Sequence, residues 1–325
     1  MTTHNRRANT RAEVIYLGLS VIAVVGFASW RFAKAYSYSP ATPPLLVAGL
    51  AATPYQYRVL VPGLVHGLQN LFPDLFGEMM VLFFITDLTA TFLLHLVFRR
   101  YLNLFFTHSQ SRLLSFSLFY ALPFSFVHVF WYPWDLPSIL FFTLGLWLIH
   151  QRNWRWYYPL FVIATFNRET TFFLTLIYAI TAWGQDKPGT IARHMTAQGI
   201  LWGTIKIALF FLYVHNPGTG FAELQFAPNL NRLTHWPSIG IILTSWGGLW
   251  APVVVGWRRL QSQFLRRATL MAPPFCLIML VIGVVDERRI LGEMAPVIVP
   301  ASLAILTDLH GALSGLVIPG IFNRR

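Results

Sequence analysis

Apolar residues occur along the chain in long runs that are separated by short polar segments. A helix needs about 20 mostly apolar residues to cross the hydrocarbon core of a bilayer. Eight runs approach this length, at residues 14–32, 79–98, 113–130, 136–150, 198–214, 239–257, 268–285 and 296–309. The pattern therefore predicts an all-α fold, a polytopic transmembrane helix bundle of about eight spans, with residues 1–325 forming a single transmembrane domain.

A further apolar run, residues 157–182, carries a polar Asn-Arg-Glu triplet at residues 167–169. Lys and Arg are enriched in cytoplasmic loops, so the later basic clusters indicate how this run is arranged. A straight span would place the Arg pairs at 258–259 and 266–267 outside, whereas a hairpin returns them to the cytoplasm. Non-helical backbone at membrane depth is tolerated where it lines a wet cavity. We therefore expect a re-entrant helical hairpin at 157–182.

The same topology gives a cytoplasmic tail of residues 1–13 and an external loop of residues 34–78 with an interfacial helix. The run at 14–32 is long for a signal sequence, so we expect an uncleaved first helix. Four polar segments then lie at the external face: the loop, the turn at 131–135, the hairpin tip and the segment 286–293. Such convergence of separate segments on one side is the arrangement of a site.

Composition also favours residence in a membrane. The chain is 55% hydrophobic and only 11% charged, whereas a soluble domain carries about 25% charged residues. The net charge of +12 comes largely from Arg in short clusters between apolar runs, where such residues orient helices. We therefore expect membrane lipids as partners and no nucleic acid. Cys276 is the only cysteine, so an intramolecular disulfide cannot form.

Ionisable groups inside an apolar run are expensive to bury and usually face a partner or water. Arg168, with Asn167 and Glu169, predicts an anion-binding guanidinium beside a carboxylate in an external cavity. The alternative is an ion pair that only fastens two short helices together. Arg58 precedes an apolar stretch that is too short to span. It either faces a lipid head group or extends to the interface as a snorkelling cation.

The segment between the last two expected spans holds Glu287, Arg288 and Arg289, after Asp286. Arginine can bind phosphate through two parallel hydrogen bonds, so this segment is a candidate phosphate-binding site. The alternative is a solvated loop whose charges pair with one another. Helical spacing would allow Arg289 to pair with Asp286 and with Glu293.

The turn at 131–135 combines Trp131 and Trp134 with Asp135. Aromatic residues at the end of a span normally form an interfacial belt. Asp135 beside these rings is a candidate to hold a sugar hydroxyl or to act as a base. The alternative is that Asp135 caps the helix that follows it. Asp87, inside the second span, is either a functional carboxylate or a packed polar residue.

Four short pieces of the chain resemble a known family. They are Tyr-Arg-Val-Leu-Val-Pro at 57–62, Trp-Asp-Leu-Pro at 134–137, Asn-Arg-Glu-Thr at 167–170 and Glu-Arg-Arg at 287–289 ahead of Pro296. Together they resemble bacterial polytopic membrane proteins similar to the C-type glycosyltransferases. The resemblance implies a bacterial inner (plasma) membrane location, an outward-facing site, a polyprenyl-phosphate-linked sugar as donor and a carboxylate base.

The leading hypothesis is a membrane glycosyltransferase that transfers a sugar from a polyprenyl-phosphate donor on the external face. The family usually has an acidic residue early in its first external loop, but residues 14–73 contain no Asp or Glu. The acid role would then fall on Asp74, Glu78, Asp135 or Glu169. We expect Asp135 as the base, with Glu169 as a second catalytic candidate. Arg168, Arg288 or Arg289 would hold the leaving phosphate and stabilise its growing charge.

Three other functions are compatible with the sequence: a transporter or flippase of a lipid-linked or anionic solute, a polysaccharide polymerase or ligase, and a structural subunit of a membrane complex. A broken helix is also a transporter device, but no second broken segment matching 167–169 is visible. No His, Cys, Asp or Glu spacing resembles a metal site. No cofactor is expected, and the need for a divalent metal and the oligomeric state stay open.

Overall fold

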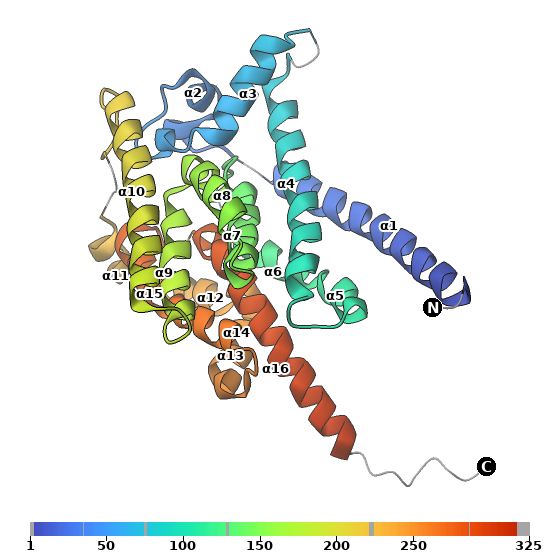
Figure 1. Cartoon of the computed structure of the whole chain (residues 1–325). Helices are drawn as coiled ribbons and strands as arrows, with labels where there is room; N and C mark the ends of the chain where they lie inside the picture. Colours follow the sequence, from blue (N-terminus) through green and yellow to red (C-terminus); the bar gives the residue numbers. More distant parts are fainter. Residues whose placement is uncertain are drawn as a thin grey trace, which may run out of the picture.

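The computed structural model describes residues 3–34, 36–74, 77–127, 130–220, 224–285 and 287–316. Within these residues the chain forms helices joined by loops, without a strand (Figure 1). The α-helices are α1 (Thr3–Ala33), α2 (Pro43–Ala48), α3 (Leu60–Leu71), α4 (Met79–Leu102), α5 (His108–Leu114), α6 (Ser117–Ser125), α7 (Asp135–His150), α8 (Trp154–Asn167), α9 (Phe172–Ala182), α10 (Pro188–Leu212), α11 (Phe226–Arg232), α12 (Trp236–Leu243), α13 (Trp250–Gly256), α14 (Gln263–Ala268), α15 (Ala272–Ile282) and α16 (Ala295–Leu316). Short 3-10 helices are η1 (Ser39–Ala41), η2 (Tyr55–Tyr57), η3 (Glu169–Thr171), η4 (Ser245–Gly248), η5 (Trp257–Arg259), η6 (Thr269–Met271) and η7 (Arg288–Met294).

Five helical segments of the described chain are long and apolar enough to cross a membrane. They are Thr10–Ala33, Met79–Leu102, Pro188–Leu212, Gln263–Ile282 and Arg288–Leu309. Asp135–His150 and Glu169–Ala182 are shorter apolar helical segments. The all-α class expected from the sequence is therefore confirmed, and five of the expected spans correspond to helices of membrane-crossing length.

Two of the expected spans are not continuous helices. In the run 113–130, α6 covers only nine residues, with Pro123 near its C-terminal end. The run 239–257 is interrupted at Trp246 and Gly247, which have left-handed φ angles of 53° and 65°. Tyr120 accounts for the break at Gly247, because its hydroxyl donates a hydrogen bond of 2.8 Å to the Gly247 carbonyl and its ring fills the space that a Cβ would need.

The run 157–182 folds as two helices, α8 and α9, that return toward the same end. The ring of Trp154, at the start of α8, lies 4.8 Å from that of Tyr178 near the end of α9. Both rings contact His194, in the first half of α10. The connecting tip lies further along α10, where Trp202 donates to the Glu169 carbonyl at 2.9 Å. The turn begins at Arg168, whose extended backbone (φ −161°, ψ 144°) ends α8.

α7 lies at the centre of the helices. It packs against α4 on one side and α8 on another, and every residue of the segment 131–140 is buried. A polar stripe at four-residue spacing on α4 faces α1, and it includes His95, whose Nε2 lies 2.9 Å from both the Tyr16 and Ser20 hydroxyls. These contacts join α1 to α4.

The loop between α1 and α4 is held by the segment that follows α10. Thr53 donates its backbone N–H to the Pro217 carbonyl at 2.7 Å. The Asn216 amide donates to the carbonyls of Gly49 and Ala51 at 2.8 and 2.9 Å. Gly218 lies against the Thr53 backbone with a φ of 125°, so the position of the loop depends on a glycine.

The two ends of the bundle differ in their charges. The end that holds the start of α1 carries Arg99, paired with Glu13 at 2.7 and 2.8 Å, and Arg152, paired with Asp186 at 3.3 Å. Arg267 joins the same end, because it donates to the Thr181 carbonyl at 3.1 Å. The opposite end gathers the α1–α4 loop, the hairpin tip and the start of α7.

We predict that Gly218→Ala loosens the α1–α4 loop. Its Cβ would meet the Thr53 backbone, and the left-handed backbone strains any side chain, so the expected loss is about 1–3 kcal/mol of folding free energy. Thermal unfolding of the detergent-solubilised protein measures this loss. Gly199→Ala is the matched control, because its Cβ would meet nothing within 4 Å. Equal unfolding temperatures of the two variants would contradict the prediction.

Candidate functional site

A single carboxylate joins three separate parts of the chain. Asp135, the first residue of α7, is 1% exposed. Its Oδ1 accepts from Arg168 Nη1 at 3.4 Å and from Arg289 Nη1 at 3.3 Å, and its Oδ2 accepts from Arg31 Nη2 at 3.3 Å. These arginines lie in the last turn of α1, at the hairpin tip and in η7. Asp135 therefore connects the turn at 131–135 to the hairpin tip and to the segment 286–293, three of the four segments expected to converge, and also to α1, which was not among them.

The local sequence explains the position of this carboxylate. Trp134 is the N-cap of α7, and it makes no side-chain capping bond, so Asp135 is not the cap that the alternative interpretation expected. It instead occupies the first turn of α7, where the helix dipole favours a negative charge. Asn167 fixes the hairpin tip beside it, because its amide donates to the Trp134 carbonyl at 3.0 Å and to the Ser138 hydroxyl at 2.8 Å.

Each arginine around Asp135 also has a carboxylate partner of its own. Arg31 pairs with Asp87, which also accepts from the Trp131 indole at 2.9 Å. Arg168 Nη1 lies 2.9 Å from Glu293, and Arg289 pairs with Glu287. The wider buried group also contains Lys206, and it has five cations (Arg31, Arg58, Arg168, Lys206, Arg289) and five carboxylates (Asp87, Asp135, Glu169, Glu287, Glu293). We call these ten residues the charge cluster; its formal charges cancel.

Arg58 and Glu169 form the part of the charge cluster nearest to solvent. Arg58 donates from both Nε, at 3.1 Å, and Nη2 to the two carboxylate oxygens of Glu169. The Arg58 side chain is 8% exposed, whereas that of Glu169 is 32% exposed. Burial acts to lower the pKa of Arg58, but the Glu169 carboxylate more than offsets this effect, so the pKa lies above its ordinary value.

An aromatic stack supports the guanidiniums. Arg289 lies over the Tyr132 ring at 4.1 Å and Arg58 over the Trp134 ring at 4.8 Å. Tyr132 stacks on Trp134 at 4.8 Å and on Tyr55 at 5.5 Å. Burial raises the pKa of Tyr132, so its phenol stays neutral. Ring faces of this kind attract cations and hold Arg planes in fixed orientations.

A polar cavity of about 100 Å³ opens beside the stack. Its charged lining consists of Arg58, Arg168, Glu169, Glu287 and Arg289. Three guanidinium N–H groups at this site, Arg58 Nη1, Arg168 Nε and Arg289 Nε, have no hydrogen-bond partner among the described residues. Buried donors of this kind normally have a partner, so these three groups are candidate donors to an anion that enters the site.

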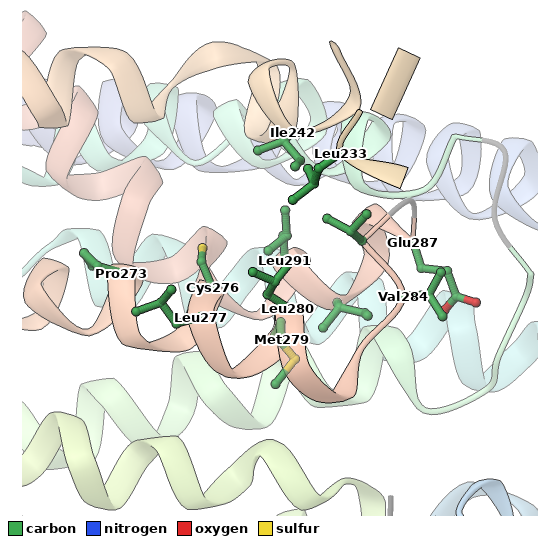
Figure 2. A pocket seen from close by; sticks show the side chains of 12 residues that line it. Leu233, Ile242, Pro273, Cys276, Leu277, Met279, Leu280, Val284, Glu287 and Leu291 are labelled. Carbon is green, nitrogen blue, oxygen red and sulfur yellow. The ribbon is translucent and has the colours of Figure 1, made fainter. Parts of the chain in front are cut away.

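An apolar groove adjoins the polar cavity. Its first part, about 440 Å³, shares Met279, Val284, Glu287 and Ile290 with the cavity. Figure 2 shows this part, with Glu287 at one end and apolar side chains along the rest. A second part of about 590 Å³ lies along α12, α13 and α15 and shares Cys276 and Leu291 with the first. A charged cavity is thus joined to a long apolar surface.

Several of the expected site residues do not line the polar cavity. Asp135 and Asn167 are buried and do not line the cavity. The Trp131 and Trp134 rings are also buried outside its lining. Arg288 is half-buried and outside the cavity lining. Asp286 lies outside the described residues. No group of three or more His, Cys, Asp or Glu that could hold a metal occurs in the described part of the chain.

The sequence analysis missed the roles of Arg31, Lys206 and Glu293. Arg31 and Lys206 are isolated cations within or at the end of apolar runs, and such cations usually have a buried partner. That signal could have identified them. Helical spacing predicts Arg289 as a partner of Glu293, whereas the structure pairs Glu293 with Arg168 on the hairpin tip.

Comparisons with protein families, with curated proteins and with solved structures found no match to this chain. The geometry of the site therefore carries the functional argument.

We predict that the main effect of Asp135→Asn is to lower the stability of the fold. The substitution leaves three buried guanidiniums without their shared charge, and breaking a buried pair in this way costs about 3–5 kcal/mol. Thermal unfolding and size-exclusion profiles in detergent would show the loss. Asp74→Asn removes an exposed carboxylate and should stay within about 0.5 kcal/mol. A stable Asp135→Asn protein would contradict this role.

Proposed function

We propose that this chain is a multi-pass membrane glycosyltransferase whose donor is a sugar linked to polyprenyl phosphate. One observation carries the proposal: a cavity lined by three guanidiniums and two carboxylates adjoins an apolar groove, with which it shares four lining residues. Guanidiniums suit the phosphate, carboxylates suit proton transfer, and an apolar groove suits a hydrocarbon tail. This combination is the chemistry that transfer from a lipid-phosphate sugar requires.

The proposed location is the inner (plasma) membrane of a bacterium, with the N-terminus in the cytoplasm. Five described helices are long and apolar enough to cross a bilayer, which supports residence in a membrane. The end that carries Arg99, Arg152 and Arg267 would be cytoplasmic by the enrichment of basic residues on that side. The charge cluster then faces outward, and the α8–α9 hairpin re-enters from the cytoplasmic side with its polar tip at the cavity.

In the proposed complex, the donor phosphate binds Arg58, Arg168 and Arg289, and the polyprenyl tail lies in the apolar groove. All three arginines line the cavity, and each has one buried N–H group without a hydrogen-bond partner among the described residues. Glu287 and Val284 line both the cavity and the groove, which supports a lipid whose phosphate lies in the cavity and whose tail lies in the groove. Its two parts, of about 440 and 590 Å³, fall within the roughly 300–1,000 Å³ typical of pockets that bind small molecules.

The proposed base is Glu169. Asp135 was favoured from the sequence, but it is fully buried behind three arginines, which suits a positioning residue. Glu169 lines the cavity and is 32% exposed. Its carboxylate takes the proton of the acceptor hydroxyl as the acceptor oxygen attacks the anomeric carbon. The bond from that carbon to the phosphate oxygen breaks, and its electron pair leaves with the phosphate, where Arg168 and Arg289 stabilise the charge. Attack from the opposite face inverts the anomeric centre.

We expect the purified protein in proteoliposomes to release sugar from one member of a panel of polyprenyl-phosphate sugars. Glu169→Gln should lower kcat by roughly 10²–10⁴ because the base is lost. Glu78→Gln is the control, since this exposed carboxylate makes no capping bond and lies outside the cavity lining. Lipid-linked sugar that crosses the bilayer without turnover would instead indicate a flippase. The absence of both turnover and transport would favour a structural subunit. Elongation of a sugar chain would indicate a polymerase or ligase.

The single cysteine gives a test of the groove. Cys276 is exposed and lines both parts of the apolar groove. We expect saturating polyprenyl phosphate to slow labelling of Cys276 by a small maleimide at least about fivefold, because the tail covers the thiol. A water-soluble sugar phosphate should leave the rate unchanged. Labelling that is insensitive to the lipid would exclude this groove as the tail site.

A further inference from the structure

The polar cavity is too small for the ligand that its side chains suit. Its volume is about 100 Å³, whereas pockets that enclose small molecules are roughly 300–1,000 Å³. Its arginines are also occupied, because Arg58 holds Glu169 through two nitrogens and Arg289 holds Glu287. An anionic head group can therefore enter only if a carboxylate leaves.

Arg58 is the fixed partner of the outer pair. Its guanidinium lies over the Trp134 ring at 4.8 Å and 5.6 Å from the Tyr55 ring centre, and its side chain is 8% exposed. The loop that carries it is anchored at Thr53 and Gly49 by the segment after α10. A guanidinium held from two sides keeps its orientation when its partner moves.

Glu169 is the movable partner. Its side chain is 32% exposed, four times the exposed fraction of Arg58, so it can rotate toward solvent. Its backbone stays in place, since the Trp202 indole donates to its carbonyl at 2.9 Å. Exchange at Arg58 thus requires only side-chain rotation and no refolding of the hairpin tip.

We propose that the Glu169 carboxylate occupies the place of the substrate phosphate on Arg58, and that an arriving phosphate displaces it. The displaced carboxylate loses its strongest counter-charge and becomes a better proton acceptor only when the donor is bound. The inference rests on the proposed function and adds its regulation: the Arg58–Glu169 pair is a gate that couples phosphate binding to activation of the base. Water then meets a paired, inactive carboxylate when no donor is present.

Binding of undecaprenyl phosphate, which has no sugar to transfer, tests the gate without turnover. Glu169→Asp keeps the charge but is one methylene shorter, so it cannot hold both nitrogens of Arg58 in the same way. We expect Glu169→Asp and Glu169→Gln nanodiscs to bind the lipid about tenfold more tightly than wild type, because the competing carboxylate is weakened. Native mass spectrometry or lipid titration measures the affinity, and thermal unfolding checks that each variant is folded.

The possible outcomes distinguish gating by the Arg58–Glu169 pair from a general effect of removing a negative charge. They also distinguish failure of the gate from failure of the proposed function. Glu78→Gln removes an external carboxylate away from the cavity and should leave the affinity unchanged. Tighter binding by Glu169→Gln alone, with Glu169→Asp equal to wild type, would show a general charge effect and overturn the gate. Wild-type affinity in both Glu169 variants would also overturn it, while lipid binding itself would still support the proposed function. No binding by any protein would overturn both.

Discussion

The Asp135 carboxylate is shared by guanidiniums from α1, the hairpin tip and η7, which are more than 100 residues apart along the chain. The shared charge joins these segments at one point, and the Arg168–Glu293 pair adds a direct contact between the hairpin tip and η7. α7 can serve as the central element because it presents this carboxylate in its first turn while the remainder of the helix is apolar. The cavity, the aromatic stack and the groove mouth all lie around this one group.

A buried charge cluster is not an efficient way to stabilise a fold, since removing charges from water costs as much as their attraction returns. Apolar residues of similar size would pack the same space with less penalty. The cluster instead supplies oriented donors: Arg58, Arg168 and Arg289 each keep one N–H group without a hydrogen-bond partner among the described residues. Donors fixed in advance need no rearrangement when negative charge develops, which is the usual basis of electrostatic catalysis.

The sequence was sufficient to predict the helical class, and it identified the turn at 131–135, the hairpin tip and the segment 286–293 as polar segments that could meet, although not the contribution of Arg31 from α1. Those predictions rested on hydrophobic length and on isolated charges, both of which are local signals. Pairings were not predictable, because Arg168 reaches Asp135 and Glu293 through tertiary packing that no spacing encodes. The break at Trp246 was missed for the same reason, since the Tyr120 contact that accompanies it comes from α6. The burial of Asp135 among three arginines could not be predicted from the sequence either. This burial is the reason that the proposed base is Glu169.

The order of the charges along the chain has a consequence for biogenesis. A membrane protein is inserted from its N-terminus as it is synthesised. A cation near the N-terminus can therefore enter the bilayer before its carboxylate partner, which lies later in the chain, has been made. In the charge cluster, the formal charge summed from the N-terminus never exceeds two. After Asp135 this sum never exceeds one. In the proposed membrane protein, the part of the charge cluster already inserted would therefore stay within two charges of neutrality. The order of the charges is Arg31, Arg58, Asp87, Asp135, Arg168, Glu169, Lys206, Glu287, Arg289 and Glu293.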